Sequence, residues 1–137
     1  MTHADVQLTH ADVQRWLDRY VDAWRSYDPV AIGDLFAADA EYRYHPWDEP
    51  VRGREAIVRD WIEPNGSASS RDEPGTYDAA YEPFAVDGSR AVAVGHSDYF
   101  SDASRATLDR RYHNAYLLEF DAEGRCRDFT EFFIKEA

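Results

Sequence analysis

The chain has 137 residues, of which 44% are hydrophobic and 15% aromatic. This length suits one domain with a sizeable core, and the composition excludes disordered and collagen-like proteins. Fifteen basic and 27 acidic residues give a net charge of −12. We therefore expect neither nucleic-acid nor membrane partners, because phosphate backbones and lipid headgroups carry the same negative sign.

The cysteine content bears on the cellular compartment. Cys126 is the only cysteine, which excludes an internal disulfide and is typical of a cytoplasmic protein. The sequence has no apolar run approaching the roughly 20 residues that a membrane-spanning helix needs, and its start lacks a signal-peptide pattern. We predict a cytoplasmic location.

A short repeat opens the sequence, where residues 2–7 (THADVQ) recur unchanged at residues 9–14. Two copies seven residues apart are too few and too short for a solenoid. Each copy has the Thr-x-x-Asp spacing of an acidic capping box, so either Thr2 or Thr9 could begin the same helix. We interpret the repeat as a duplication that lengthens a helix, with a partner-binding extension as the alternative. Residues 1–8 are assigned to an N-terminal extension, helical or frayed, and residues 9–137 to the domain.

Three helices are predicted in the first half of the chain. Between residues 9 and 27 apolar side chains recur three and four positions apart, which is typical of an amphipathic helix. They are Val13, Trp16, Leu17, Tyr20, Val21, Trp24 and Tyr27. Asp28 and Pro29 suit the N-cap and first position of a short second helix, which we expect to reach Phe36. A third helix is predicted over residues 54–62.

The segments around the third helix are predicted to be a strand and two loops. We expect a short strand at residues 41–44 and a loop with two prolines at residues 45–50. Residues 63–75 are rich in Pro, Gly, Ser and charge and have nothing to bury, which indicates a mobile surface loop. Asp72 and Glu73 in this loop are expected to be solvated.

The second half changes to the pattern of strands. Residues 76–86, 90–100, 107–120 and 125–135 are rich in β-forming side chains, and turns separate them. Asp87-Gly88 is a strong hairpin signal, and residues 121–124 form a second turn. Helices followed by an antiparallel meander predict an α+β fold, with three N-terminal helices packed on a curved, mainly antiparallel sheet.

Several motifs taken together resemble the NTF2-like superfamily. They are Arg19-Tyr20 followed by Asp28, residues 35–40 (LFAADA), residues 53–57 (GREAI), residues 120–125 (FDAEGR) and residues 131–133 (EFF). More narrowly the chain is similar to the SnoaL-like group, which includes ketosteroid isomerases and polyketide cyclases, over residues 12–135. The resemblance implies a cone-shaped barrel with one deep pocket, and a homodimer through the outer sheet face. Outward apolar residues such as Ala115 and Leu117 fit that dimer.

Strand alternation, with the hairpins aligned to those of the family, predicts which side chains line the pocket. The substrate-binding side chains expected on its walls and rim are Trp16, Trp24, Tyr44, His45, Trp47, Trp61, Val94, Asn114, Tyr116, Leu118, Phe129 and Phe133. Aromatic walls with a few converging polar groups are typical of a small-molecule site. We therefore expect a small, mostly apolar or aromatic ligand.

The same alternation places three ionisable groups inside, Glu131, His96 and Asp98, and the first helix adds Tyr20. A carboxylate in an apolar cavity has a raised pKa, and a nearby histidine lowers it again. Such a cluster could transfer protons at neutral pH, with Glu131 or the His96–Asp98 pair as the base. The alternative is a buried network in which these polar groups only satisfy one another.

The resemblance implies a catalytic role for Tyr20, whereas other catalytic positions of the isomerases hold different residues in this chain. Tyr20 matches the isomerase tyrosine that donates a hydrogen bond to the developing oxyanion. Tyr44 and His45 stand before Pro46 where the isomerase has its base aspartate, Tyr116 stands where it has a second aspartate, and Trp61 replaces another tyrosine. Steroid isomerisation through that aspartate is therefore disfavoured.

The sequence is compatible with two functions. The first is cofactor-free acid–base catalysis as an isomerase, cyclase, dehydratase or hydrolase. The second is a non-catalytic ligand-binding or dimerisation module. We expect no cofactor and no metal, because the five histidines lack ligand spacing, Cys126 has no CxxC partner and no glycine-rich phosphate loop is present.

Overall fold

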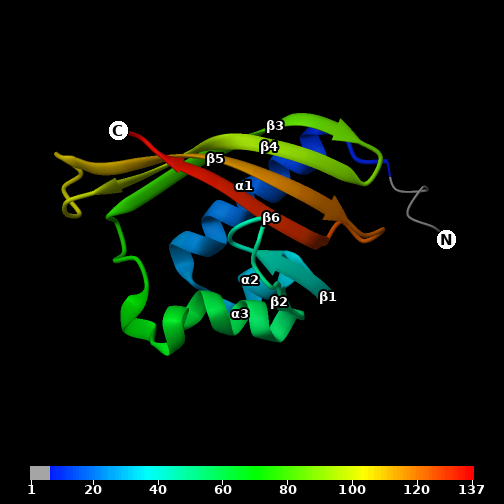
Figure 1. The fold of residues 1–137 in the computed structure, drawn as a ribbon, viewed down its shortest axis with the longest axis horizontal. Helices are drawn as coiled ribbons and strands as arrows, with labels where there is room; N and C mark the ends of the chain where they lie inside the picture. The colour runs from blue at the N-terminus through cyan, green and yellow to red at the C-terminus, as the bar shows by residue number, and fades with distance from the viewer. Residues whose placement is uncertain (1–6) are drawn as a thin grey trace.

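A computed structural model describes residues 7–137. Its centre is one six-stranded sheet with the order β2-β1-β6-β5-β4-β3. The sheet is curved and open, and the three helices lie on one side of its long strands (Figure 1). The predicted α+β architecture is confirmed, whereas the sheet is not closed into a barrel because β2 and β3 form free ends of the strand order.

The helices begin and end close to where the sequence predicts. They are α1 (His10–Ser26), α2 (Pro29–Asp34) and α3 (Arg54–Ile62). Thr9 caps α1 through a complete capping box, in which its hydroxyl accepts from the Asp12 amide and the Asp12 carboxylate accepts from the Thr9 amide. Thr2 and most of the predicted extension of residues 1–8 lie outside the described residues.

Four of the six strands match the predicted segments to within one residue at each end, whereas β1 is longer than predicted and β2 was not predicted. The strands are β1 (Phe36–Arg43), β2 (Val51–Arg52), β3 (Tyr77–Asp87), β4 (Arg90–Phe100), β5 (Leu108–Phe120) and β6 (Cys126–Lys135). The predicted second helix stops at Asp34, and Phe36 instead begins β1, which pairs in parallel with β6. All other neighbouring strands are antiparallel. Two short 3₁₀ turns, Pro64–Gly66 and Ala68–Ser70, follow α3.

The core lies between the helices and the concave face of the sheet. Its largest fully buried side chains are Tyr116, Phe36, Phe120, Phe129, Leu17, Ile32, Leu35, Ile57, Val13 and Cys126. Trp16 is also buried there, and its indole N–H donates to the Leu35 carbonyl at 3.0 Å. Within residues 7–137, no helix is long and apolar enough to cross a membrane.

The predicted inward face is right for β5 and β6 and wrong for β4. Facing residues of antiparallel strands share a face, and the register pairs Ala93 with Tyr116 and Val94 with Ala115. Ala91, Ala93 and Ser97 are accordingly buried, whereas Val94, His96 and Asp98 point to the outer face.

A β-bulge is the physical reason for this inversion. Phe100 pairs with Leu108, and continuing that register would place Val94 opposite Asn114, on the inner face. The register instead shifts by one residue between Tyr99 and Phe100. A shift of one residue moves every following side chain of the strand to the opposite face.

His96 and Asp98 consequently form a cluster on the outer face. The Asp98 carboxylate accepts from the Arg111 guanidinium at 2.6 and 2.9 Å and lies 3.2 Å from His96 Nδ1. These hydrogen bonds, led by that of Arg111, hold the pKa of Asp98 below its usual range. The predicted shared cavity of His96, Asp98, Glu131 and Tyr20 therefore does not form.

Candidate active site

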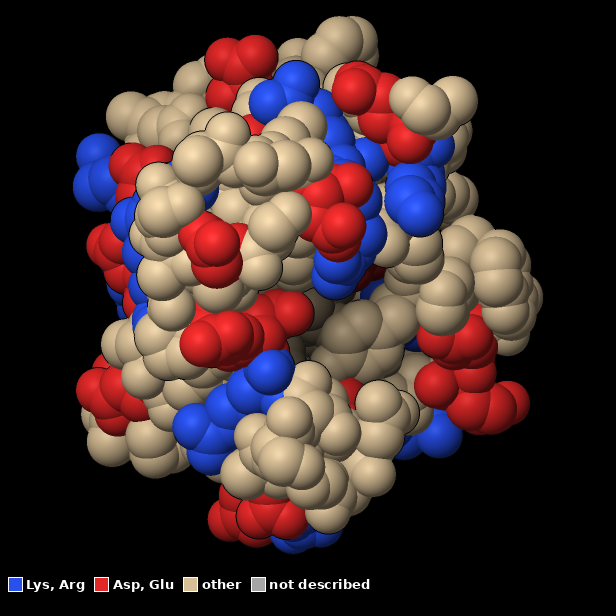
Figure 2. All heavy atoms as spheres, turned by 90° about the vertical axis from the view of Figure 1, so that its left-hand side faces the viewer, with Lys and Arg blue, Asp and Glu red and all other residues tan. Residues whose placement is uncertain are grey.

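A cavity of about 260 Å³ lies between the helices and the inner face of the sheet. Figure 2 shows a hollow at the end of the molecule formed by the segment after α3 and the β4–β5 hairpin, with acidic and basic side chains around it. The lining residues are Tyr20, Trp24, Tyr27, Tyr42, Tyr44, Asp60, Trp61, Pro64, Ser70, Arg71, Asp72, Tyr81, Ser97, Tyr99, Tyr116 and Glu131. Every long element of the fold contributes to this list.

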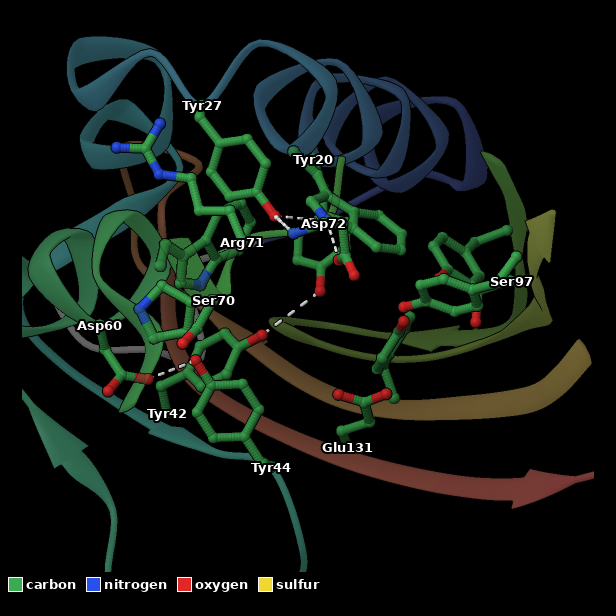
Figure 3. Close-up of a pocket in the computed structure, with 16 residues that line it drawn as sticks. Tyr20, Tyr27, Tyr42, Tyr44, Asp60, Ser70, Arg71, Asp72, Ser97 and Glu131 are labelled. Carbon is green, nitrogen blue, oxygen red and sulfur yellow. Dashed lines mark hydrogen bonds between the residues drawn. The ribbon is translucent and has the colours of Figure 1, made fainter. Parts of the chain in front are cut away.

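Glu131 projects from β6 into the cavity (Figure 3). Its Oε2 accepts a hydrogen bond from the Asn114 amide at 3.0 Å, and the Asn114 carbonyl oxygen accepts from the Ser97 hydroxyl at 3.1 Å. Burial raises the pKa of Glu131 to about 7, while the Asn114 bond and the nearby His45 lower it. The carboxyl can therefore both take up and release a proton near neutral pH.

Tyrosine hydroxyls surround Glu131, and we refer to the six as the tyrosine belt. The belt consists of Tyr20, Tyr42, Tyr44, Tyr81, Tyr99 and Tyr116. Burial raises the pKa of each, and the Glu131 charge raises it further. All six therefore stay protonated at neutral pH and can donate hydrogen bonds.

Two hydrogen bonds organise part of the belt. The hydroxyls of Tyr20 and Tyr42 lie 3.3 Å apart, and the Tyr44 hydroxyl donates to Asp60 on α3. The ring of Tyr42 stacks on that of Phe129 with centroids 4.3 Å apart, so the cavity floor is a packed aromatic surface.

The segment after α3 lies at the surface, as predicted, and also forms one wall of the cavity. Asp72 is part of this wall, and its Oδ2 accepts from the Trp24 indole N–H at 3.2 Å. The Arg71 Nε donates to the Ile62 carbonyl at 2.7 Å. The expectation of a solvated Asp72 is wrong because α1 places Trp24 where it can bond this carboxylate. Glu73 is exposed, as predicted.

Comparison with known families fits this architecture. A SnoaL-like domain matches residues 17–129. The chain belongs to the SnoaL-like domain family. The predicted relationship to the NTF2-like superfamily is thereby confirmed.

Solved structures of similar shape support the fold of this SnoaL-like domain. A protein assigned as a ketosteroid isomerase from Kribbella flavida DSM 17836 is 22% identical, with a TM-score of 0.62, over 93% of this chain and 81% of that one. A protein from Sphaerobacter thermophilus is 17% identical, with a TM-score of 0.61, over 88% and 94% of the two chains. An LEH-like epoxide hydrolase from M. tuberculosis is 12% identical, with a TM-score of 0.61, over 91% and 84%. No curated protein matches the sequence.

The SnoaL-like domain brings only part of the predicted site together. Six predicted residues line the cavity: Tyr20, Trp24, Tyr44, Trp61, Tyr116 and Glu131. Asn114 does not line the cavity but donates a hydrogen bond to Glu131. Trp16, Leu118 and Phe129 belong to the buried core. His45, Trp47 and Phe133 lie outside the lining, where His45 stacks on Trp47, which is 78% exposed. Val94, His96 and Asp98 are on the other face of the sheet.

Sequence reasoning missed ten lining residues of the domain. They are Tyr27, Tyr42, Asp60, Pro64, Ser70, Arg71, Asp72, Tyr81, Ser97 and Tyr99. The nine tyrosines of the chain could have indicated some of these residues, because a buried tyrosine hydroxyl usually has a hydrogen-bond partner. Ser97 and Tyr99 could be assigned to the inner face only once the register shift of β4 was known. Asp72 could be assigned to the cavity wall only from its hydrogen bond with Trp24.

The ionisable groups of the site are carboxyls, tyrosine hydroxyls and one arginine. Among residues 7–137, no group of three or more His, Cys, Asp or Glu side chains is placed to hold a metal ion. With its proton, Glu131 is an acid, and without it a base, while the belt offers neutral donors to an oxygen atom that becomes negative. This arrangement can perform proton transfer next to a carbonyl group.

Proposed function

We propose that this domain is a cofactor-independent acid–base enzyme of the isomerase, cyclase, dehydratase or hydrolase type. Its substrate is a small, mostly apolar or aromatic molecule with a carbonyl, hydroxyl or epoxide group. The observation that carries the proposal is the position of Glu131, a partly buried carboxyl with a pKa of about 7 in an aromatic cavity ringed by tyrosine hydroxyls.

The reaction follows from these groups. The Glu131 carboxylate takes a proton from a carbon next to the substrate carbonyl, and the C–H electron pair moves into the new C=C bond of an enolate. Tyr20, whose hydroxyl is paired with that of Tyr42, donates a hydrogen bond to the enolate oxygen. The Glu131 acid then returns the proton to the same or another carbon, which completes an exchange or an isomerisation.

Deuterium exchange tests this function without knowledge of the natural substrate. In D₂O the protein should catalyse exchange of the methyl protons of acetophenone, a small aromatic ketone, as followed by ¹H NMR. Removing the base in Glu131→Gln should slow catalysed exchange by about 100-fold or more, because a positioned base contributes roughly 10²–10⁴-fold. Tyr20→Phe should slow it by about tenfold or more.

The control is Glu82→Gln, which removes an exposed carboxylate from the outer face of β3. This variant should exchange like the wild type. The catalysed rate should rise with pH through a midpoint of about 7, where Glu131 loses its proton. Unchanged exchange in Glu131→Gln would contradict the proposal.

A non-catalytic binding module is the second candidate. The bonds of Tyr20 to Tyr42 and of Tyr44 to Asp60 favour it, because they form a network that is partly satisfied without a ligand. Ligand binding without any catalysed exchange by the wild type would support this candidate over the enzyme.

Assembly as a homodimer through the outer sheet face belongs to the same proposal. Leu117 is 47% exposed, Phe132 41% and Ile134 74%, and the strand register puts all three on that face. Apolar side chains gathered on one sheet face are typical of a protein interface. A cytoplasmic location also stays a prediction, supported by the buried, unpaired thiol of Cys126.

A further inference from the structure

The outer end of the cavity contains a second carboxylate that the proton transfer at Glu131 does not use. Asp72 lines the cavity from the segment after α3, whereas Glu131 comes from β6, and Figure 3 shows the two on different walls. Tyr99 lines the same cavity as both carboxyls, and burial together with the charges of Asp72 and Glu131 raises its pKa. A ligand that reaches Glu131 therefore has Asp72 within its environment.

A strained residue anchors this carboxylate. Tyr27, at the C-cap of α1, has a φ of 50°, a left-handed conformation that is unfavourable for a residue other than glycine. Its hydroxyl accepts hydrogen bonds from the Asp72 amide at 3.3 Å and from the Trp24 indole at 3.2 Å. The same indole donates to Asp72 Oδ2 at 3.2 Å. Asp72 is thus held in one position before a ligand binds.

Asp72 keeps acceptor capacity toward the cavity. An ionised carboxylate has about four acceptor positions, and the hydrogen bonds from Trp24 and Tyr27 use only part of them. Burial raises the pKa of Asp72 above its usual value, because part of its hydration is lost in this wall. A hydrogen-bond donor on the ligand would replace that hydration.

The charges near Asp72 decide which donor fits. The Arg110 guanidinium lies 4.2 Å from the Tyr99 ring centroid, and its charge lowers the pKa of Asp72. The Arg71 guanidinium lies 5.2 Å from the Tyr27 ring centroid, so a second cation is present at the same end. A ligand cation would meet these arginines, whereas a neutral hydroxyl gains the hydrogen bond to a charged acceptor without that repulsion.

Different walls of the cavity thus differ in hydrogen-bonding character. The tyrosine belt supplies donors around Glu131, and Asp72 supplies an acceptor on the wall formed by the segment after α3. We propose that Asp72 is a specificity-determining residue that accepts a hydrogen bond from a substrate hydroxyl, which makes the substrate a hydroxy-carbonyl compound. This inference rests on the proposed function for the orientation of the carbonyl group toward Glu131.

Three aryl ketones of one shape test the inference. Acetophenone has no second polar group, 4′-(hydroxymethyl)acetophenone adds a hydroxyl, and 4′-(aminomethyl)acetophenone adds an ammonium group. Their dissociation constants are measured by NMR titration of the wild type, Asp72→Asn, Asp72→Ala and the control Glu73→Gln, whose carboxylate is exposed on the same segment. Their deuterium exchange is recorded separately.

The wild type and Glu73→Gln should bind the hydroxymethyl ketone about tenfold or more tightly than acetophenone, and also more tightly than the aminomethyl ketone. The preference for the hydroxyl should shrink in Asp72→Asn, whose neutral amide is a weaker acceptor, and vanish in Asp72→Ala. Acetophenone should bind all four proteins equally, which shows that the cavity is intact.

Other results would overturn the inference. They are equal binding of acetophenone and the hydroxymethyl ketone by the wild type, tighter binding of the ammonium compound, or equal weakening of all three ketones in Asp72→Ala. Exchange is judged apart from binding. An Asp72-dependent preference without catalysed exchange would contradict the acid–base function and still support recognition of the hydroxyl.

Discussion

Glu131 shows how one residue can couple function to stability. Its carboxyl has a pKa of about 7 in the folded protein, against an ordinary value of 4.5. Between these pH values the folded state binds more protons than the unfolded state, so the free energy of unfolding falls as pH rises. The stabilising contribution is present in full below about pH 4.5 and is lost as pH rises through 7. The ionised Glu131 carboxylate that acts as a base near neutral pH therefore lowers the free energy of unfolding at that pH.

We predict that Glu131→Gln is more stable than the wild type above pH 7, by on the order of 1–3 kcal/mol, because each pKa unit corresponds to about 1.4 kcal/mol. The difference should shrink toward pH 4.5. Urea unfolding at a series of pH values measures it, with Glu82→Gln as the control that keeps the pH dependence of the wild type. A Glu131→Gln curve parallel to that of the wild type would show that Glu131 titrates normally.

At the scale of elements, the pairing of β3 with β4 depends on a missing side chain. Gly95 on β4 faces Asn114, and a Cβ at this position would lie 2.0 Å from the Ala80 carbonyl oxygen and 2.8 Å from the Tyr81 Cα. Backbone atoms cannot move aside as a flexible side chain can, so only glycine fits here. The close approach helps to position Tyr81 of the tyrosine belt.

We predict that Gly95→Ala lowers the free energy of unfolding by about 2 kcal/mol or more, because two strands must separate to accept the methyl group. Gly33→Ala is the matched control. Gly33 lies in α2, and its added Cβ would be in ordinary contact with Arg54 and Val58 side chains at 3.6 Å. That variant should be as stable as the wild type or up to about 1 kcal/mol more stable. Equal stability of the two variants in urea would refute the role given to Gly95.

At the scale of the whole molecule, the helices cover one face of the sheet and leave the other uncovered within the described residues (Figure 1). The uncovered face carries Leu117, Phe132 and Ile134 together with the Asp98–Arg111 pair. A chain with a net charge of −12 repels its own copies at long range, so an apolar face is needed to hold two of them together.

We predict that the wild type sediments as a dimer at micromolar concentration and that Leu117→Glu sediments as a monomer, because the new carboxylate would be buried without a partner. Val30→Glu is the control, since Val30 is 69% exposed on α2, away from the sheet face, and should leave the dimer intact. A monomeric wild type in sedimentation velocity would contradict the interface.

The positions of the helices and the family relationship could be predicted from short sequence patterns. The apolar spacing of α1, the capping box at Thr9 and the Asp28-Pro29 start of α2 all depend on neighbours within a few residues. The inward faces of β5 and β6, and with them Glu131 and Tyr116, were predictable because a short turn connects these strands and the pairing is regular from Tyr112–Lys135 to Glu119–Asp128.

Only the tertiary structure decided which face of β4 meets the cavity and what closes its outer end. One unpaired residue on β5, Asp109, lies between the pairs Tyr99–Arg110 and Phe100–Leu108; this bulge exchanged His96 and Asp98 for Ser97 and Tyr99, and no local pattern marks it. Asp72 became part of the site through a bond to Trp24, 48 residues away in sequence. Register shifts and long-range bonds depend on how complete elements pack together, whereas helix signals depend on residues one turn apart.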